Sequence, residues 1–462
     1  MHQNQHGLDF TAASAEAVGH YDATVSAYLT FQKDTGLHLK QTLTADPEMA
    51  MAQCLRGYFF QLFCNPAVAG KAEQSLDAAK VSANKNGATR REKLHIAALE
   101  AWCKGDLIGA TDRWEDILLE APRDTLALRL AHFTHFYFGR GDAMRDSAAR
   151  TLYAWDEGMP DYGRVLGIYA FGLEESGDYA KAEEFGRRAV ADNPADIWSV
   201  HAVAHVMEMQ GRRRDGIDWL TGLESSWSTA NNFAYHVWWH RSLYHLELQQ
   251  FDRVLELYDA HIRGDQDSDD YLDMSNGAAM LWRLEANGVD VGDRWRELAD
   301  KSERRTDDHL LVFADAHFVL ALAAAGKFDA AARMLETMRG ATDDTTTEGP
   351  IFADVGQPLC EAILALAQGE HGKAVDLIQP IRYDIQRIGG SHAQRDLFQQ
   401  MLITASLKAE RFDLARALLS ERTADAAASA WSWQRYAEAL TALDDATGAA
   451  AAESKARTLL AA

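Results

Sequence analysis

The stretch that decides the fold reads Glu175-Ser-Gly177-Asp-Tyr179-Ala-Lys-Ala182-Glu-Glu-Phe185. Gly177 is followed by an aromatic residue two positions later, by an alanine five positions later and by Pro194 seventeen positions later. Glycine lets a chain that leaves one helix adopt a positive φ, and alanine lets two helices cross closely. This order therefore predicts two antiparallel helices joined by a tight turn.

The same order is typical of the tetratricopeptide repeat, which is about 34 residues long. Equivalent turn positions recur at spacings of 34 to 43 residues. They fall at Gly105, Gly139, Gly177, Gly211, Gln249, Gly288, Gly326, Gly369 and Glu410. Small or packing residues follow at Ala110, Ala182, Gly216, Val254, Ala331, Ala374 and Ala415. We predict an all-α protein, an α-solenoid of tetratricopeptide-like helical hairpins that curls around an inner pocket.

Three regions are expected along the chain. Residues 1–46 form an N-terminal capping helix region, residues 47–423 an array of about ten tetratricopeptide-like hairpins, and residues 424–462 the C-terminal capping helices. The polar stretch from Gly340 to Pro350 is expected to be a loop between two hairpins.

Composition and charge argue against two kinds of partner, nucleic acid and membrane. The net charge of −23 argues against a nucleic-acid partner, because binding to a phosphate backbone needs clustered Lys and Arg. The first nine residues have neither the basic nor the apolar part of a signal peptide, and no run of about 18 apolar residues occurs. The four cysteines are scattered, without a C-x-x-C pair. We expect a cytoplasmic protein without a membrane or nucleic-acid partner.

Two His-x-x-x-His pairs lie in neighbouring predicted helices, His201 with His205 and His236 with His240. Residues four apart stand over one another on an α-helix, and Glu208 falls on the same face as the first pair. If the two helices are neighbours, the imidazoles and Glu208 converge. Convergent polar groups beside aromatic residues describe a ligand site better than a core.

Candidate roles follow from the residue types. His201 or His205 could act as a general base, with Glu208 fixing its tautomer and His236 beside it. Arg129 and Arg164 suit a substrate carboxylate, and the tryptophans could stack on a planar ligand. The predicted ligand-binding residues are His95, Arg129, Arg164, Trp198, Trp239, His240, Trp282, His392 and Arg395.

A metal ion is an alternative use of the same histidines. The two pairs supply enough imidazoles for zinc, iron or nickel, but neither pair has the glutamate of His-Glu-x-x-His. A bound metal is therefore not favoured, and the cofactor is left unknown. The plainest alternative is that each histidine only packs in the core.

Two further motifs are interpreted as helix starts. The acidic stretch Asp265–Asp273 resembles a calcium loop but lacks its glycine and its last glutamate, so we expect it to cap the next helix. Ser391 stands three residues before Gln394, which predicts a capping box. His392 and Arg395 of that helix could face the mouth of the pocket.

Several motifs together resemble the tetratricopeptide repeat protein 38 family, a StaR-like group. They are Arg91–Ala98, His201–Arg212, Asn231–His240, Asp269–Asp273 with Leu281–Leu284, and Gly389–Asp396. The resemblance covers most of the chain and implies a tetratricopeptide-like solenoid. It implies no activity.

Two functions remain open. The first is a solenoid that binds a small molecule or short peptide in a His/Trp/Glu-lined inner pocket. The alternative is an enzyme, a hydrolase or lyase, that uses the His201, His205 and His236 cluster as acid–base groups or metal ligands. The late hairpins present mainly apolar inner faces, so we expect them to curl over the early ones or to pack on another copy in a homo-oligomer.

Overall fold

The computed structural model describes residues 1–343 and 345–461. Its first half contains β1 (His2–Gln3), β2 (Asp9–Phe10), α1 (Ala15–Leu29), α2 (Thr35–Ala45), α3 (Ala50–Leu62), α4 (Pro66–Asn86), α5 (Arg90–Cys103), α6 (Leu107–Glu120), α7 (Thr125–Tyr137), α8 (Gly141–Ala149), η1 (Leu152–Ala154), α9 (Tyr162–Glu175), α10 (Tyr179–Asp192), α11 (Ile197–Met209), α12 (Arg213–Leu223) and η2 (Glu224–Trp227).

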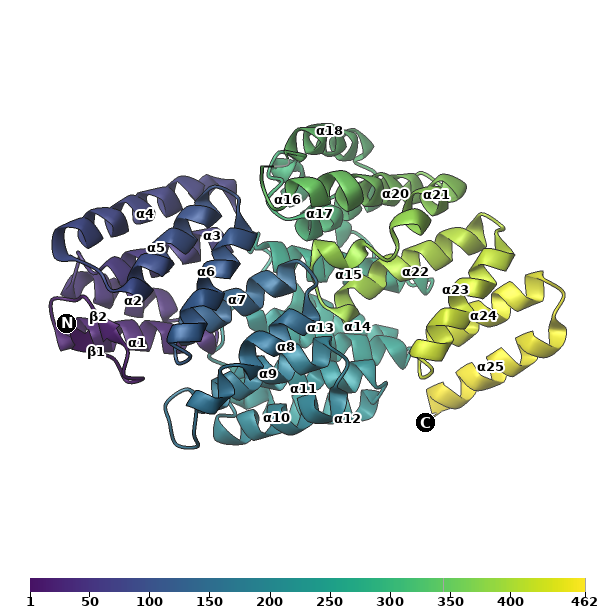
Figure 1. Ribbon diagram of the computed structural model, residues 1–462. Coiled ribbons are helices and arrows are strands. Elements are labelled where there is room, and N and C mark those ends of the chain that lie inside the picture. The colour runs from purple at the N-terminus through teal and green to yellow at the C-terminus, as the bar shows by residue number, and fades with distance from the viewer. Residues whose placement is uncertain (344, 462) are drawn as a thin grey trace. The chain divides into compact units, whose positions relative to one another are not determined.

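The second half contains α13 (Phe233–Glu247), α14 (Phe251–Leu257), η3 (Tyr258–Ile262), α15 (Tyr271–Ala286), α16 (Trp295–Ser302), η4 (Glu303–Arg305), α17 (Val312–Ala324), α18 (Phe328–Met338), η5 (Arg339–Ala341), α19 (Gly349–Ile351), η6 (Phe352–Gly356), α20 (Gln357–Ala367), α21 (His371–Ile381), η7 (Ile385–Ile388), α22 (His392–Lys408), α23 (Phe412–Asp425), α24 (Ala430–Ala442) and α25 (Ala446–Ala461). Figure 1 shows successive helices paired as hairpins, as in α3 with α4 and α9 with α10.

The predicted turn positions are confirmed by the backbone. All nine have a positive φ, between 56° and 81°, including the two that are not glycine, Gln249 and Glu410. The same conformation occurs at Phe31, Cys64 and Asp444, which lie between α1 and α2, α3 and α4, and α24 and α25. The hairpin pattern therefore continues into the segments on either side of the predicted array.

The small residues that follow the turns are buried where two helices meet. Ala110, Ala182, Ala331, Ala374 and Ala415 are fully buried. At Gly216 on α12, an added Cβ would lie 2.3 Å from the ring of Tyr244 on α13. These close approaches explain why larger side chains do not occupy the positions.

The chain divides into two compact units. The first comprises Met1–Val203, Leu223–Ala234 and Asp343–Pro350, and the second comprises Ala204–Gly222, Tyr235–Thr342 and Ile351–Ala462. The prediction of an all-α fold made of tetratricopeptide-like hairpins is confirmed. In the described residues, strand pairing within a sheet is limited to β1 and β2, which pair antiparallel over two residues each.

The predicted loop between hairpins is anchored at one of the turns. The amide of Thr347 donates to the carbonyl of Gly105, at 2.9 Å, and its Oγ1 accepts a hydrogen bond from the amide of Leu107 at 3.0 Å. Of the predicted loop, Asp343–Pro350 belongs to the first unit, and the residues before Asp343 belong to the second. After it, the continuous helical stretch Gly349–Ala367 has a mean hydropathy of 1.3 in its most apolar window, half of which is buried. Its α20 part packs on α17 and α18, as a core helix does.

Candidate functional site

Three buried histidines of the second unit lie together. His205 is on α11, and His236 and His240 are one turn apart on α13. One ring nitrogen of each lies within 4.8 Å of a ring nitrogen of the other two. The rings of His205 and His240 are 4.2 Å apart and those of His236 and His240 are 4.8 Å apart. We call His205, His236 and His240 the histidine cluster.

Hydrogen bonding orders two of these rings. Nδ1 of His236 lies 3.0 Å from Oδ1 of Asn276 on α15, and Nε2 of His236 lies 3.3 Å from Nε2 of His240. Because the amide oxygen only accepts, Nδ1 of His236 carries the proton and Nε2 presents its lone pair to His240. The ring of His236 also stacks on Trp239 with an interplanar angle of 13°.

Burial disfavours the charged form of two of these rings. It lowers the pKa of His205 well below the ordinary value, and the nearby charges of His236, His392 and Arg395 lower it further. It also lowers the pKa of His236 to about 4, against the opposing effect of the bond to Asn276. The side chains are 0% to 4% exposed, so water does not offset the cost of charging them.

His201 stands one turn before His205 on α11, as predicted, but it falls in the first unit. Its ring packs among aromatic rings of that unit, 5.4 Å from Trp198, 5.3 Å from Phe171 and 5.1 Å from Phe233. Of the four residues predicted as catalytic, His201 belongs to the first unit, and His205, Glu208 and His236 belong to the second.

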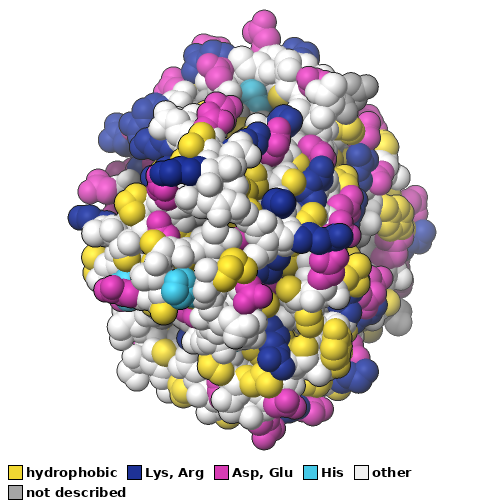
Figure 2. Space-filling view, turned by 60° about the vertical axis from the view of Figure 1, so that its left-hand side comes forward, with side chains coloured by type: hydrophobic (Ala, Val, Ile, Leu, Met, Phe, Trp, Pro, Cys, Tyr) yellow, Lys and Arg dark blue, Asp and Glu magenta, His cyan; other side chains and the backbone are white. Residues whose placement is uncertain are grey.

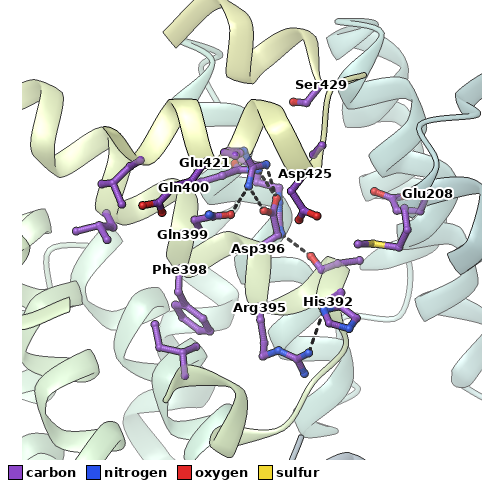
Figure 3. Close-up of a pocket in the computed structure, with 18 of the residues that line it drawn as sticks. Glu208, His392, Arg395, Asp396, Phe398, Gln399, Gln400, Glu421, Asp425 and Ser429 are labelled. Carbon is purple, nitrogen blue, oxygen red and sulfur yellow. Dashed lines mark hydrogen bonds and ion pairs between the residues drawn. The ribbon is translucent and has the colours of Figure 1, made fainter. Parts of the chain in front are cut away.

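The second unit also contains a pocket of about 390 Å³, which we call the Glu208 pocket. It is drawn in Figure 3, where Glu208 of α11 lies across from the side chains of α22 and α23. Three predicted site residues line it: Glu208, His392 and Arg395. The prediction that late hairpins would close over earlier ones holds within this unit, because α11, α13 and α15 share the pocket with α21, α22 and α23.

Glu208 is the group that the protein leaves least satisfied in this pocket. Its Oε2 is shielded from solvent and has no hydrogen-bond partner among the described residues. Burial raises its pKa to about 8, Arg213 lowers it and Glu247 raises it. Glu208 is therefore largely protonated at neutral pH and can donate a hydrogen bond into the pocket.

The opposite wall is held by an ion pair. Arg422 on α23 binds Asp396 on α22 through two nitrogens, one of them at 2.9 Å from Oδ2, and donates to Oε1 of Gln399 at 2.6 Å. Arg422 also donates to Oγ of Ser432 at 2.8 Å. Burial raises the pKa of Asp396, but Arg422 outweighs it and leaves the pKa below the ordinary value.

His392 and Arg395 lie at the start of α22. The predicted capping box is present: Oγ of Ser391 accepts from the amide of Gln394, and Oε1 of Gln394 accepts from the amide of Ser391. It fixes the first turn, in which Arg395 donates to the carbonyl of Gly390 and lies 3.4 Å from Nδ1 of His392. The acidic stretch also caps its helix as predicted, with Asp270 accepting from the amide of Leu272.

Other predicted ligand-binding residues occupy separate places. His95 is a satisfied core histidine, 3.1 Å from Asp124 and 3.2 Å from the hydroxyl of Tyr58. Arg164 forms an ion pair with Asp161. Trp282 lines another pocket of the second unit, of about 350 Å³, with Glu285 and Lys408.

Arg129 and Trp198 lie together in the first unit, in what we call the Arg129 box. The guanidinium lies 4.5 Å from the ring of Trp198, 5.1 Å from Phe133 and 5.7 Å from Phe31. It donates to the carbonyl of Leu29 at 3.1 Å, while its Nε and Nη1 have no hydrogen-bond partner in the described part of the chain. Burial lowers its pKa to about 10.

The sequence interpretation missed three residues of the second unit. Asn276 orients His236, Asp396 holds the wall of the pocket, and Arg283 lines the pocket beside Trp239, which its guanidinium approaches to 5.6 Å. Arg283 directly follows the predicted Trp282 and sits off the expected inner-face positions. Arg283 and Asp396 lie in the motifs Leu281–Leu284 and Gly389–Asp396, but neither motif gave them a role.

No family model matches this chain. Among solved structures, it is similar to human IFIT1 crystallised as a dimer with PPP-AAAA, at 12% identity over 98% of this chain and 96% of that chain, with a TM-score of 0.41. It is also similar to the tetratricopeptide repeat domain of P58(IPK), at 13% identity over 80% of this chain and 98% of that chain, with a TM-score of 0.22. Such identities and TM-scores carry no function over. The chain is a tetratricopeptide-like helical repeat protein with a buried histidine cluster.

Proposed function

We propose that this protein binds a small polar molecule or a short peptide in the Glu208 pocket. The observation that carries the proposal is the unpartnered Oε2 of Glu208 at a pocket of about 390 Å³. A buried polar group without a partner costs about 1–3 kcal/mol, and a ligand that accepts its hydrogen bond removes that cost. The volume is within the range of small-molecule sites, roughly 300–1,000 Å³.

The lining favours a ligand with both polar ends and an apolar middle. Arg213, Arg283 and Arg395 supply positive charge, and Glu247 and Asp425 supply negative charge. Leu243, Leu246, Phe398, Leu402 and Leu418 supply apolar surface. A carboxylate on the ligand would meet the arginines, and Glu208 would donate to a carbonyl or similar acceptor.

A pair of adjacent alanines offers a matched test. Ala426 lines the pocket, whereas Ala427 is exposed and outside it. Native mass spectrometry of the purified full chain, followed by thermal-shift screening of polar metabolites and short peptides, would identify the ligand. Ala426→Trp should abolish its binding and Ala427→Trp should retain it. Equal binding by both variants would overturn the proposal.

Acid–base catalysis by a hydrolase or lyase is the second candidate. It is supported by the opposite shifts of two groups one turn apart on α11: Glu208 has a raised pKa of about 8, and His205 has a pKa well below its ordinary value. A protonated acid beside a neutral base is the arrangement that such chemistry uses. In this case Glu208→Gln would keep ligand affinity within about tenfold and lose turnover, whereas a pure binding protein shows no turnover to lose.

The proposal also includes family and setting. We propose membership in the tetratricopeptide repeat protein 38 family, supported by motifs that supply site residues: His201–Arg212, Asn231–His240 and Gly389–Asp396. The net charge of −23 supports a partner other than nucleic acid. A cytoplasmic location without a membrane partner is also part of the proposal. On the face shown in Figure 2, basic and acidic side chains are interspersed. A homo-oligomer is part of the proposal, and light scattering would test it.

A further inference from the structure

We propose that the histidine cluster is a binding site for one divalent transition-metal ion of the zinc type, with His205, His236 and His240 as ligands. The inference does not rest on the proposed function, because the cluster does not line the Glu208 pocket. The missing glutamate of His-Glu-x-x-His counts against a metalloprotease motif. It does not count against a site made only of imidazoles.

The first argument is the distance between two ligand atoms. Nε2 of His236 and Nε2 of His240 are 3.3 Å apart. Two nitrogens bound tetrahedrally to zinc at about 2.0–2.1 Å are separated by about 3.3–3.4 Å. The two histidines on α13 therefore already stand at the separation of two corners of a zinc site.

The third ligand comes from a different helix. One ring nitrogen of His205 on α11 lies within 4.8 Å of a ring nitrogen of His236 and of a ring nitrogen of His240. Imidazole nitrogens suit zinc, copper, iron and nickel, and three histidines leave a fourth position for water or another anionic or neutral donor.

The second argument is the partner of His236 on its far side. Nδ1 of His236 donates to Oδ1 of Asn276, at 3.0 Å, which leaves Nε2 unprotonated and facing the cluster. Histidines that bind metals usually donate their other ring nitrogen in this way, which fixes the tautomer and the ring plane. Stacking on Trp239 holds the same plane.

The third argument is burial together with the direction of the ring nitrogens. The three rings are 0% to 4% exposed. A core histidine usually satisfies its nitrogens with carbonyls or carboxylates, as His95 does with Asp124 and as His317 does with the carbonyl of Phe313, at 2.7 Å. In the cluster, His236 and His240 instead direct the same nitrogen, Nε2, toward each other. A metal ion that displaces the proton between them would bind both nitrogens.

The test uses tag-free full-length protein and the metal alone. Elemental analysis after expression with zinc should find one ion per chain, and after chelation the protein should take up one Co²⁺ with the visible absorption of a tetrahedral site. His236→Gln and His240→Gln should weaken Co²⁺ binding at least about 100-fold, and Asn276→Leu should weaken it about 10–100-fold as a positioning residue.

His317→Gln is the matched control, because His317 is equally buried in the same unit and lies outside the cluster. It should leave metal affinity unchanged. If the cluster variants fail to fold, X-ray absorption of the wild-type zinc protein keeps the proposal testable, because it counts imidazole ligands directly. Protein without stoichiometric metal, binding unaffected by the cluster variants, or fewer than three imidazoles around zinc would each overturn the inference.

Discussion

Two buried arginines, one in each unit, have similar surroundings but differ in how many of their guanidinium nitrogens have hydrogen-bond partners. Arg129 of α7 and Arg283 of α15 are 1% and 2% exposed, and each guanidinium lies near a tryptophan ring. Burial lowers the pKa of both. Both would be described from the sequence as cations on an inner helix.

The two arginines differ in their hydrogen bonds. Arg283 donates to the carbonyl of Ala279 at 3.2 Å and to that of Ala393 on α22 at 2.9 Å, and the charge of Asp396 favours its protonated form. Arg129 donates to one carbonyl and leaves Nε and Nη1 without partners. Arg283 therefore helps to hold the Glu208 pocket together, while Arg129 is a net cost to the first unit unless an anionic group joins it.

The largest effect is expected for Arg283→Met. This change removes the hydrogen bond from α15 to Ala393 on α22 and leaves the carboxylates of the pocket with one cation fewer. We expect a loss of about 3–5 kcal/mol in the free energy of unfolding, measured by urea denaturation. Arg411→Met, at an exposed pair with Asp376, is the control and should change little. A small loss for Arg283→Met would remove the distinction between the two arginines.

Arg129→Met should have the opposite sign. Methionine keeps the contact with Trp198 and Phe133 and removes two unsatisfied donors. We expect a gain of about 1–3 kcal/mol in the same denaturation experiment without ligand. A loss of stability would mean that the stacking of the guanidinium outweighs the missing hydrogen bonds, and Arg129 would then be a structural residue of the first unit.

Glu208→Gln tests the electrostatics of the pocket. The folded pKa of Glu208 is raised from 4.5 to about 8, so its contribution to stability is present below pH 4.5 and is lost as the pH rises through 8. Glutamine has no such loss. Between pH 5 and pH 9, the free energy of unfolding of the variant should therefore rise relative to that of the wild type. We expect a rise of about 1–3 kcal/mol, after allowance for the partial exposure of Glu208. A stability difference that is flat with pH would show that Glu208 is ordinarily ionised.

The smallest effect is expected when the capping box of one helix in each unit is removed. In the first unit, the amide of Glu92 donates to Oγ1 of Thr89, and in the second the amide of Gln394 donates to Oγ of Ser391. Thr89→Ala and Ser391→Ala should each cost about 1 kcal/mol in unfolding free energy. A much larger cost for Ser391→Ala would show that the start of α22 also supports the pocket.

The repeat was predictable because it depends on local backbone chemistry. A glycine in a left-handed turn and an alanine at a helix crossing leave a residue-type signature at a fixed place. Seven of the nine predicted turn positions are glycine, and Gln249 and Glu410 were found by their spacing from the others. The turns at Phe31, Cys64 and Asp444 carry no such signature. None of the three is a glycine, so the residue-type signature did not predict them.

The site was only partly predictable. Helical spacing placed His236 and His240 on one face, because residues four apart are neighbours on any α-helix. It could not place Asn276 beside His236 or Ala393 beside Arg283, which are 40 and 110 residues apart in sequence. The assignment of Arg129 and Arg164 to a shared substrate carboxylate stays a prediction, and Arg164 is engaged with Asp161.

Local pattern alone determined the helical hairpins, their turns, the helix caps at Asp270 and Ser391 and the pairing of histidines along each helix, since each depends on contacts within a few residues. Only the packing of distant helices decided which buried groups found partners. That packing satisfied Arg283 and left Oε2 of Glu208 and two nitrogens of Arg129 unpaired. The physical reason is that desolvation and hydrogen bonding depend on every neighbour in space, whereas a sequence motif contains only the neighbours along the chain.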